Sequence, residues 1–292
     1  MREAARQDAL MRLLRRSQGT GPDWVRDAAT LSEADPLGHL GLHPDTWRGL
    51  GAYQAHAQAI SRRTLIAHHP TVHAMLGDDA MGQLAWLLWL QAPMTQGDLG
   101  AWGDGLAALI ATHPKVAPQL APWPWLADVA MLDAAVHRSS RLPHHAVDTQ
   151  ALRALGQREA GELALLLQPH VQVCRSPWPL AELWQTHQPN AADPAAAHKL
   201  MSRLADGEPA LDETGTVVWW NDARHAVEVA PLSLADAAWM ADLRDGPACL
   251  GDLLARHGSG SGFDFGAWWL RALTHSWLQG TALWPAATLG DQ

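Results

Sequence analysis

Apolar residues recur at the spacing of an α-helix throughout the first half of the chain. Pro70, Gly77, Pro93 and Pro114 mark helix ends, because the residue before a proline avoids helical backbone angles and glycine favours a stop. The pattern predicts helices over 3–16, 46–68, 70–76, 78–91, 98–112 and 124–139. Residues 17–45 are rich in glycine and proline and predict an irregular arm. We therefore expect an all-α helical domain over 1–145.

The pattern changes in the second half, where strand signals join the helical ones. Residues 163–173 favour extended structure broken by Pro169, and Thr216–Trp220, a turn and an alternating stretch predict a β-hairpin over 216–230. The Pro/Ala/Asn-rich residues 188–199 indicate a mobile loop. Helices are predicted near 149–154, over 176–187 with Ser176 as N-cap, and over 233–244, 247–257 and 264–279. We expect an α+β domain over 146–292, so that the whole chain is α+β and mostly α.

The helix predicted over 124–139 carries an acid on its apolar face. Asp133 lies near the middle of that face, and His137 follows one turn later. A buried carboxylate needs a partner, whether it serves packing or chemistry. We interpret Asp133 and His137 as a structural pair, with a chemical role as the alternative.

The chain is acidic, with a formal net charge of −9 and only 17% charged residues. This balance argues against a broad nucleic-acid-binding surface, which requires a basic face. The longest apolar run, 84–90, is far shorter than a membrane span, and the charged residues of 1–16 do not form a signal peptide. Cys174 and Cys249 match neither a disulfide framework nor a metal-ligand spacing. We expect a cytoplasmic protein that contacts no membrane.

The sequence contains 16 histidines, which raises the question of a metal site. None of the common ligand spacings occurs, and the adjacent pairs His68-His69 and His144-His145 are poorly suited to share a metal. There is also no nucleophile elbow, no P-loop and no dinucleotide-binding glycine motif after a strand. We therefore predict no catalytic residues, no metal ligands and no cofactor.

The predicted hairpin is the better candidate for function, because an edge strand with exposed N–H and C=O groups can accept a peptide strand. Neighbouring strand residues point to opposite faces, so one of the two hairpin tryptophans must face outward. Either that side chain meets a ligand, or both are covered, one by the three-helix unit and the other by the N-terminal domain. The candidate peptide-binding residues are Val217, Val218, Trp219, Trp220, Arg224, His225, Val227 and Val229.

The stretch WPWLADVAMLDA, Trp123–Ala134, is similar to the hallmark helix of the BufC/HvfC family. Members of this family typically show (L/W)P-aromatic-L-A-D-V-A-x-L-(E/D)-x-A, and the methanobactin partner protein MbnC is a more distant relative. The resemblance continues upstream through Tyr53, Pro93 and Trp102-Gly103. Gln54 departs from the pattern, because relatives usually carry Arg after the Tyr. The resemblance implies a helical N-terminal domain of a type once labelled DNA-binding.

The predicted order of strands and then three helices resembles the winged-helix-like modules of the PqqD type, the RiPP recognition elements. Those modules bind the leader of a ribosomal precursor peptide along a strand edge. Together the resemblances imply a non-catalytic partner of a multinuclear non-haem iron oxidase (MNIO) in RiPP maturation. Such an oxidase carries the iron and modifies cysteines of the precursor, and in bufferin-type systems the product binds copper.

Two other functions stay open at this point. A DNA-binding transcriptional regulator would fit a winged-helix-like order, but it needs Lys or Arg on the recognition helix, and 247–257 offers only Arg256. A metal-dependent enzyme that uses the histidines would hold a tightly bound metal.

Overall fold

The computed structural model describes residues 46–191, 193–205, 214–244, 246, 248–258 and 260–284. The described residues form two compact units, one of 46–67 with Leu76–Gly105, the other of His68–Met75 with the described residues from Leu106 onward. The helix predicted over 3–16 and the arm over 17–45 lie outside the described residues. The boundary predicted between residues 145 and 146 falls inside the second unit.

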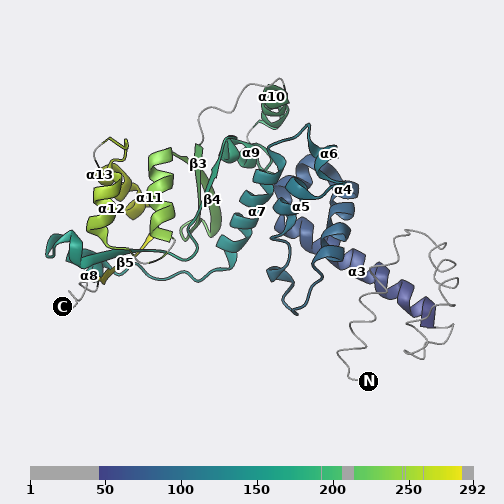
Figure 1. The fold of residues 1–292 in the computed structure, drawn as a ribbon, viewed down its shortest axis with the longest axis horizontal. Helices are drawn as coiled ribbons and strands as arrows, with labels where there is room; N and C mark the ends of the chain where they lie inside the picture. The colour runs from purple at the N-terminus through teal and green to yellow at the C-terminus, as the bar shows by residue number, and fades with distance from the viewer. Residues whose placement is uncertain are drawn as a thin grey trace, which may run out of the picture. The chain divides into compact units, whose positions relative to one another are not determined.

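Two long helices dominate the first half of the described chain (Figure 1). α3 spans Thr46–His68, and α4 spans Pro70–Gln91 with a break at Gly77, whose φ of +77° is not helical. Glycine suits this backbone because it has no Cβ to clash. The predicted helices over 46–68, 70–76 and 78–91 are therefore confirmed, including the stop at Gly77.

The single helix predicted over 98–112 is wrong. A 3-10 turn, η3, spans Leu99–Ala101, and the helix α5 begins only at Leu106 and ends at Thr112. Gly103 lies between them with φ of +128°, which an α-helix does not allow. The indole N–H of Trp102 donates to the carbonyl of Ala92 at 2.7 Å, and this bond secures the non-helical connection.

The second unit contains two small antiparallel sheets in its described part. One sheet has the order β2-β3-β4, with β2 at Gln172–Ser176, β3 at Thr214–Asn221 and β4 at Ala226–Leu232. The other pairs β1, Leu163–Leu167, with β5, Leu278–Leu283. The hairpin predicted over 216–230 and the break in extended structure at Pro169 are confirmed.

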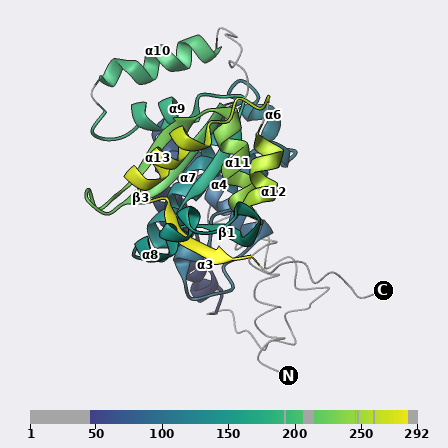
Figure 2. The same ribbon diagram turned by 90° about the vertical axis from the view of Figure 1, so that its left-hand side faces the viewer.

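Helices cover both faces of the three-stranded sheet (Figure 1). α7 (Leu126–Arg141) packs on one face together with α9 (Leu180–Thr186), and α11 (Leu234–Arg244) packs on the other. The remaining helices of this unit lie around these layers, and α10 lies beside α9, outside the sheet (Figure 2). The bounds of these remaining helices are Ala117–Leu120 (α6), Thr149–Arg153 (α8), Ala154–Gly156 (η4), Ala160–Glu162 (η5), Pro194–Ala205 (α10), Leu250–His257 (α12) and Phe265–Thr274 (α13).

Three predictions in the second half need correction. Ser176 is the last residue of β2 and not an N-cap; its hydroxyl accepts from the N–H of Trp178, and α9 begins four residues later. Residues 188–199 are not a loop throughout, because α10 begins at Pro194. The alanines after Pro194 favour a helix, and the Asp193 carboxylate accepts from the N–H of Ala195 at 2.9 Å. The helix predicted over 264–279 ends at Thr274, and the residues after it form β5.

The side chains of β3 alternate between two packed faces. Val217 and Trp219 lie in the hydrophobic core beneath α11, α12 and α13, and Val218 is equally buried from the opposite side of the strand. Because helices lie on both faces, neither face of the central strand is open to solvent at these positions. The described chain is α+β and mostly helical, and none of its helices is long and apolar enough to cross a membrane.

Candidate functional site

Half of the predicted peptide-binding side chains are not available on a surface. Val217, Val218, Trp219 and Val229 are buried, with at most 5% of each residue exposed. Trp219 packs edge-on against Trp277 at 5.7 Å, beneath the three-helix layer. The exposed or half-buried members of the predicted set are Trp220, Arg224, His225 and Val227. A peptide could therefore be recognised here only through the outer edge of the sheet and the end of the hairpin.

The hydrogen bonds of β3 fix which backbone groups face each neighbour. The N–H of Trp220 donates to His170 Nδ1 at 3.2 Å, on the β2 side of the strand. Trp220 opposes Val227, and Val218 opposes Val229 two residues along. Because paired and unpaired positions alternate in an antiparallel ladder, the backbone groups of Val227 and Val229 point away from β3.

Two further observations agree with this direction. Pro231, the next position of the same alternation, has no N–H to donate, and proline is tolerated in a strand where its nitrogen faces outward. The side-chain amide of Gln185, on α9, donates to the carbonyl of Val229 at 3.1 Å. The outer edge of β4 is therefore formed by Val227, Val229 and Pro231. The carbonyl at its middle, that of Val229, already accepts a hydrogen bond from Gln185.

A cluster of histidine and tryptophan lies at the end of the hairpin. The ring of His144 lies 4.8 Å from His170 and 4.9 Å from Trp220, and its Nδ1 is 3.6 Å from Asp222 Oδ1. Burial, followed by the nearby His144, lowers the pKa of His170 to about 4, so His170 is neutral near pH 7 and accepts from the Trp220 N–H. No local sequence signal joins His170 to this cluster, because its partners lie on other segments.

Asp133 is fully buried on α7, where its carboxylate binds two backbone N–H groups. Its Oδ2 accepts from the N–H groups of Thr71 and Val72 at 2.9 and 3.0 Å, and its Oδ1 has no hydrogen-bond partner among the described residues. Burial raises the pKa of Asp133 to about 7, against the opposing effects of the Thr71 side chain and of the backbone N–H groups of Val72 and Thr71. His137, one turn along α7, stacks on His68 with ring centroids 3.5 Å apart. Both residues thus fasten the segment 68–72 to α7, and their pairing with each other stays a prediction.

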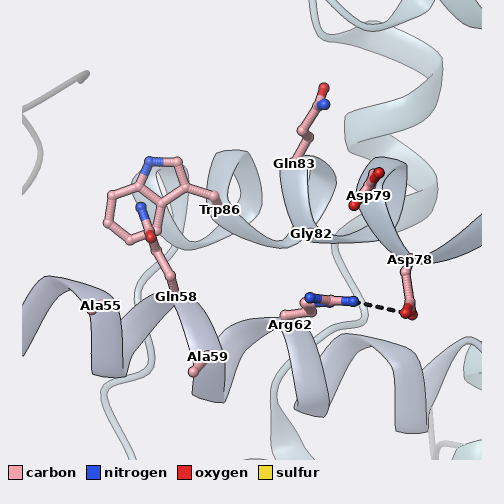
Figure 3. A pocket seen from close by; sticks show the side chains of 9 residues that line it. All are labelled: Ala55, Gln58, Ala59, Arg62, Asp78, Asp79, Gly82, Gln83 and Trp86. Atoms are coloured by element: carbon pink, nitrogen blue, oxygen red, sulfur yellow. Dashed lines mark ion pairs between the residues drawn. The ribbon is translucent and has the colours of Figure 1, made fainter. Parts of the chain in front are cut away.

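A groove with a mixed polar and apolar lining runs between α3 and α4 in the first unit (Figure 3). At one end Arg62 and Asp78 form an ion pair at 2.9 Å, and the half-buried Trp86 and Gln58 line the groove toward the other end. Small residues between these ends leave a hollow of about 570 Å³. The other lining residues are Ala55, Ala59, Asp79, Gly82 and Gln83. An open groove with an aromatic wall and one ion pair is suited to receiving a partner's side chain, and it contains no nucleophile with an adjacent base.

The helix that would read DNA in a winged-helix module is α12. Its Arg256 donates to Asp242 on α11 at 2.7 Å, and His257 bonds to the same carboxylate oxygen at 2.8 Å. The His257 bond is the first of the interactions that hold the pKa of Asp242 below its usual range. The basic groups of α12 are thus committed to an intramolecular contact, which leaves little charge for phosphates.

Within the described ranges, no three His, Cys, Asp or Glu side chains lie close enough together to hold a metal ion. Cys174 and Cys249 are both buried, and burial raises the pKa of the Cys174 thiol to about 11. The chain matches no family model, and no curated protein matches it significantly.

Proposed function

We propose that this chain is a non-catalytic accessory protein that binds the leader of a ribosomal precursor peptide and presents it to a multinuclear non-haem iron oxidase. One observation carries the proposal. A three-stranded antiparallel sheet is followed directly by α11, α12 and α13, and β4 remains an outer strand. This is the order of the RiPP recognition elements that the sequence resembles.

The edge of β4 supplies the chemistry that such recognition needs. Val227 and Val229 direct backbone groups outward, and an extended peptide laid beside them gains main-chain hydrogen bonds. Exposed groups at the hairpin end, Arg224 and His225, and the half-buried Trp220 are placed to contact side chains of that peptide. Affinity would then come from the backbone, and selectivity from the end of the hairpin.

The groove between α3 and α4 is the proposed contact for the oxidase. Trp86 and the Arg62–Asp78 pair offer an aromatic surface beside a charged one, and tryptophan is enriched where binding energy concentrates. In this division of labour the iron belongs to the oxidase, the chain holds no cofactor, and both proteins work in the cytoplasm. The modified precursor would be a peptide of the copper-binding, bufferin or methanobactin kind.

The direct test is reconstitution with the proteins encoded beside the gene. The tagged full chain should retain the neighbouring oxidase and a short cysteine-containing precursor, and the precursor's mass should change only when all three are present. Val227→Pro removes one outward N–H without touching the ladder to β3, so it should weaken retention of the precursor, whereas Val227→Thr should not.

Retention of neither partner would contradict the proposal. A salt-sensitive shift of duplex DNA at low protein concentration would favour a transcriptional regulator instead.

A further inference from the structure

A side chain already occupies the place that a bound peptide would need. Gln185 lies near the end of α9, a helix anchored by the buried residues Leu180 and Leu183, and α9 packs against β4. Its Nε2 donates to the carbonyl of Val229 at 3.1 Å. This carbonyl belongs to the set that points away from β3, so Gln185 meets it from the outside of the sheet.

The amide of a glutamine side chain is chemically the same donor as a backbone N–H. An added strand would place one of its own N–H groups at the Val229 carbonyl, because this is the next outward acceptor after Val227. Gln185 and a peptide backbone cannot both use that geometry. Position 231 is a proline and offers no donor, so further pairing along β4 is also restricted.

We propose that Gln185 is an intramolecular stand-in for the peptide, which closes the edge of β4 until a peptide displaces it. The inference rests on the proposed function and adds its regulation: an extended main chain pairs first at Val227 and then takes the Val229 carbonyl from Gln185. In the free chain the same contact protects the edge from pairing with another copy, a hazard of any open edge strand.

The chain offers a matched control for this contact. Gln188 lies one turn beyond Gln185 and donates to the carbonyl of Trp184 at 3.0 Å, not to the sheet. Gln185→Ala removes the donor, and Gln185→Glu keeps its shape but cannot donate. Gln188→Ala removes an equivalent bond elsewhere on the same segment. All variants are to be compared in the full chain.

The first measurement needs no peptide. The carbonyl ¹³C chemical shift of Val229, measured by NMR, should move in Gln185→Ala and Gln185→Glu and stay in place in Gln188→Ala. The second measurement uses the fluorescein-labelled leader of the precursor encoded beside the gene. Because one hydrogen bond no longer competes, both Gln185 variants should bind it about two- to tenfold more tightly than the natural chain.

The outcomes separate this inference from the proposed function. Equal leader affinity in the natural chain and both Gln185 variants overturns the inference but leaves peptide recognition standing. If neither the natural chain nor any variant binds the leader, the proposed function fails, and so does the inference that Gln185 closes the edge of β4 to a peptide. An unmoved Val229 shift in both Gln185 variants overturns the contact itself.

Discussion

Asp133 gives the sharpest test of how the second unit is held together. Its carboxyl is fully buried, and its pKa is raised from 3.8 to about 7 because burial penalises the charged form. Asp133→Asn places a neutral group of the same shape at the site. The carbonyl of the substituted side chain can still accept from the N–H groups of Thr71 and Val72.

The sign of the pH effect follows from linkage. A carboxyl with a higher pKa in the folded than in the unfolded chain binds its proton more tightly when folded. Its contribution to stability is therefore present below about pH 4 and is lost as the pH rises to about 7. A pKa raised from 3.8 to about 7 corresponds to about 4 kcal/mol. The amide in the Asp133→Asn variant does not titrate, so the variant does not lose stability in this way.

The assay is urea unfolding of the natural chain and Asp133→Asn, followed by tryptophan fluorescence between about pH 4 and pH 8. The difference in free energy of unfolding should shift by about 4 kcal/mol in favour of the variant across this range. The lowered pKa of His170 makes both proteins less stable as the pH falls through about 6.5 to 4, so its effect cancels in the difference. A difference that stays constant to within about 1 kcal/mol would refute the raised pKa of Asp133.

Three further results are expected. Trp86→Ala should reduce capture of the oxidase by about fivefold or more, while Gln83→Ala, at the exposed rim of the same groove, should not. Equal losses of capture in the two variants would contradict the proposal that the groove contacts the oxidase. Cys174 and Cys249 should not react with Ellman's reagent until the chain unfolds, and fast labelling of either in native buffer would contradict their burial. Gly103→Ala should destabilise the chain by about 1–3 kcal/mol, because a φ of +128° is strained for alanine; an unchanged melting temperature would contradict this.

The sequence predicts elements well where the signal is local. The hairpin and the stop at Gly77 depend on residues that are neighbours in the chain, and both are predicted at the right place. The pattern does not predict β5, because its partner, β1, lies more than a hundred residues earlier, and no local pattern encodes that pairing. It does not predict α10 either, because Pro189, Asn190 and Pro194 are typical of a loop and obscure the helix-forming alanines that follow.

The candidate site is only partly predictable for the same reason. The run Thr216–Trp220 does not alternate between apolar and polar residues, and this is typical of a strand covered on both faces. This pattern is the sequence feature that indicates that Val217 and Trp219 are core residues. Gln185 and His170 could not be found from the sequence, because each acts on the sheet through a contact with a segment distant in the chain.

Hydrogen exchange of the full chain with and without the precursor leader tests the central claim most directly. If the peptide adds to the sheet, the outward amide of the half-buried Val227 should exchange at least about tenfold more slowly in its presence, because it gains a main-chain partner. Tight binding of the leader with unchanged exchange at the Val227 amide, or with protection confined to other elements, would contradict recognition at the edge of β4.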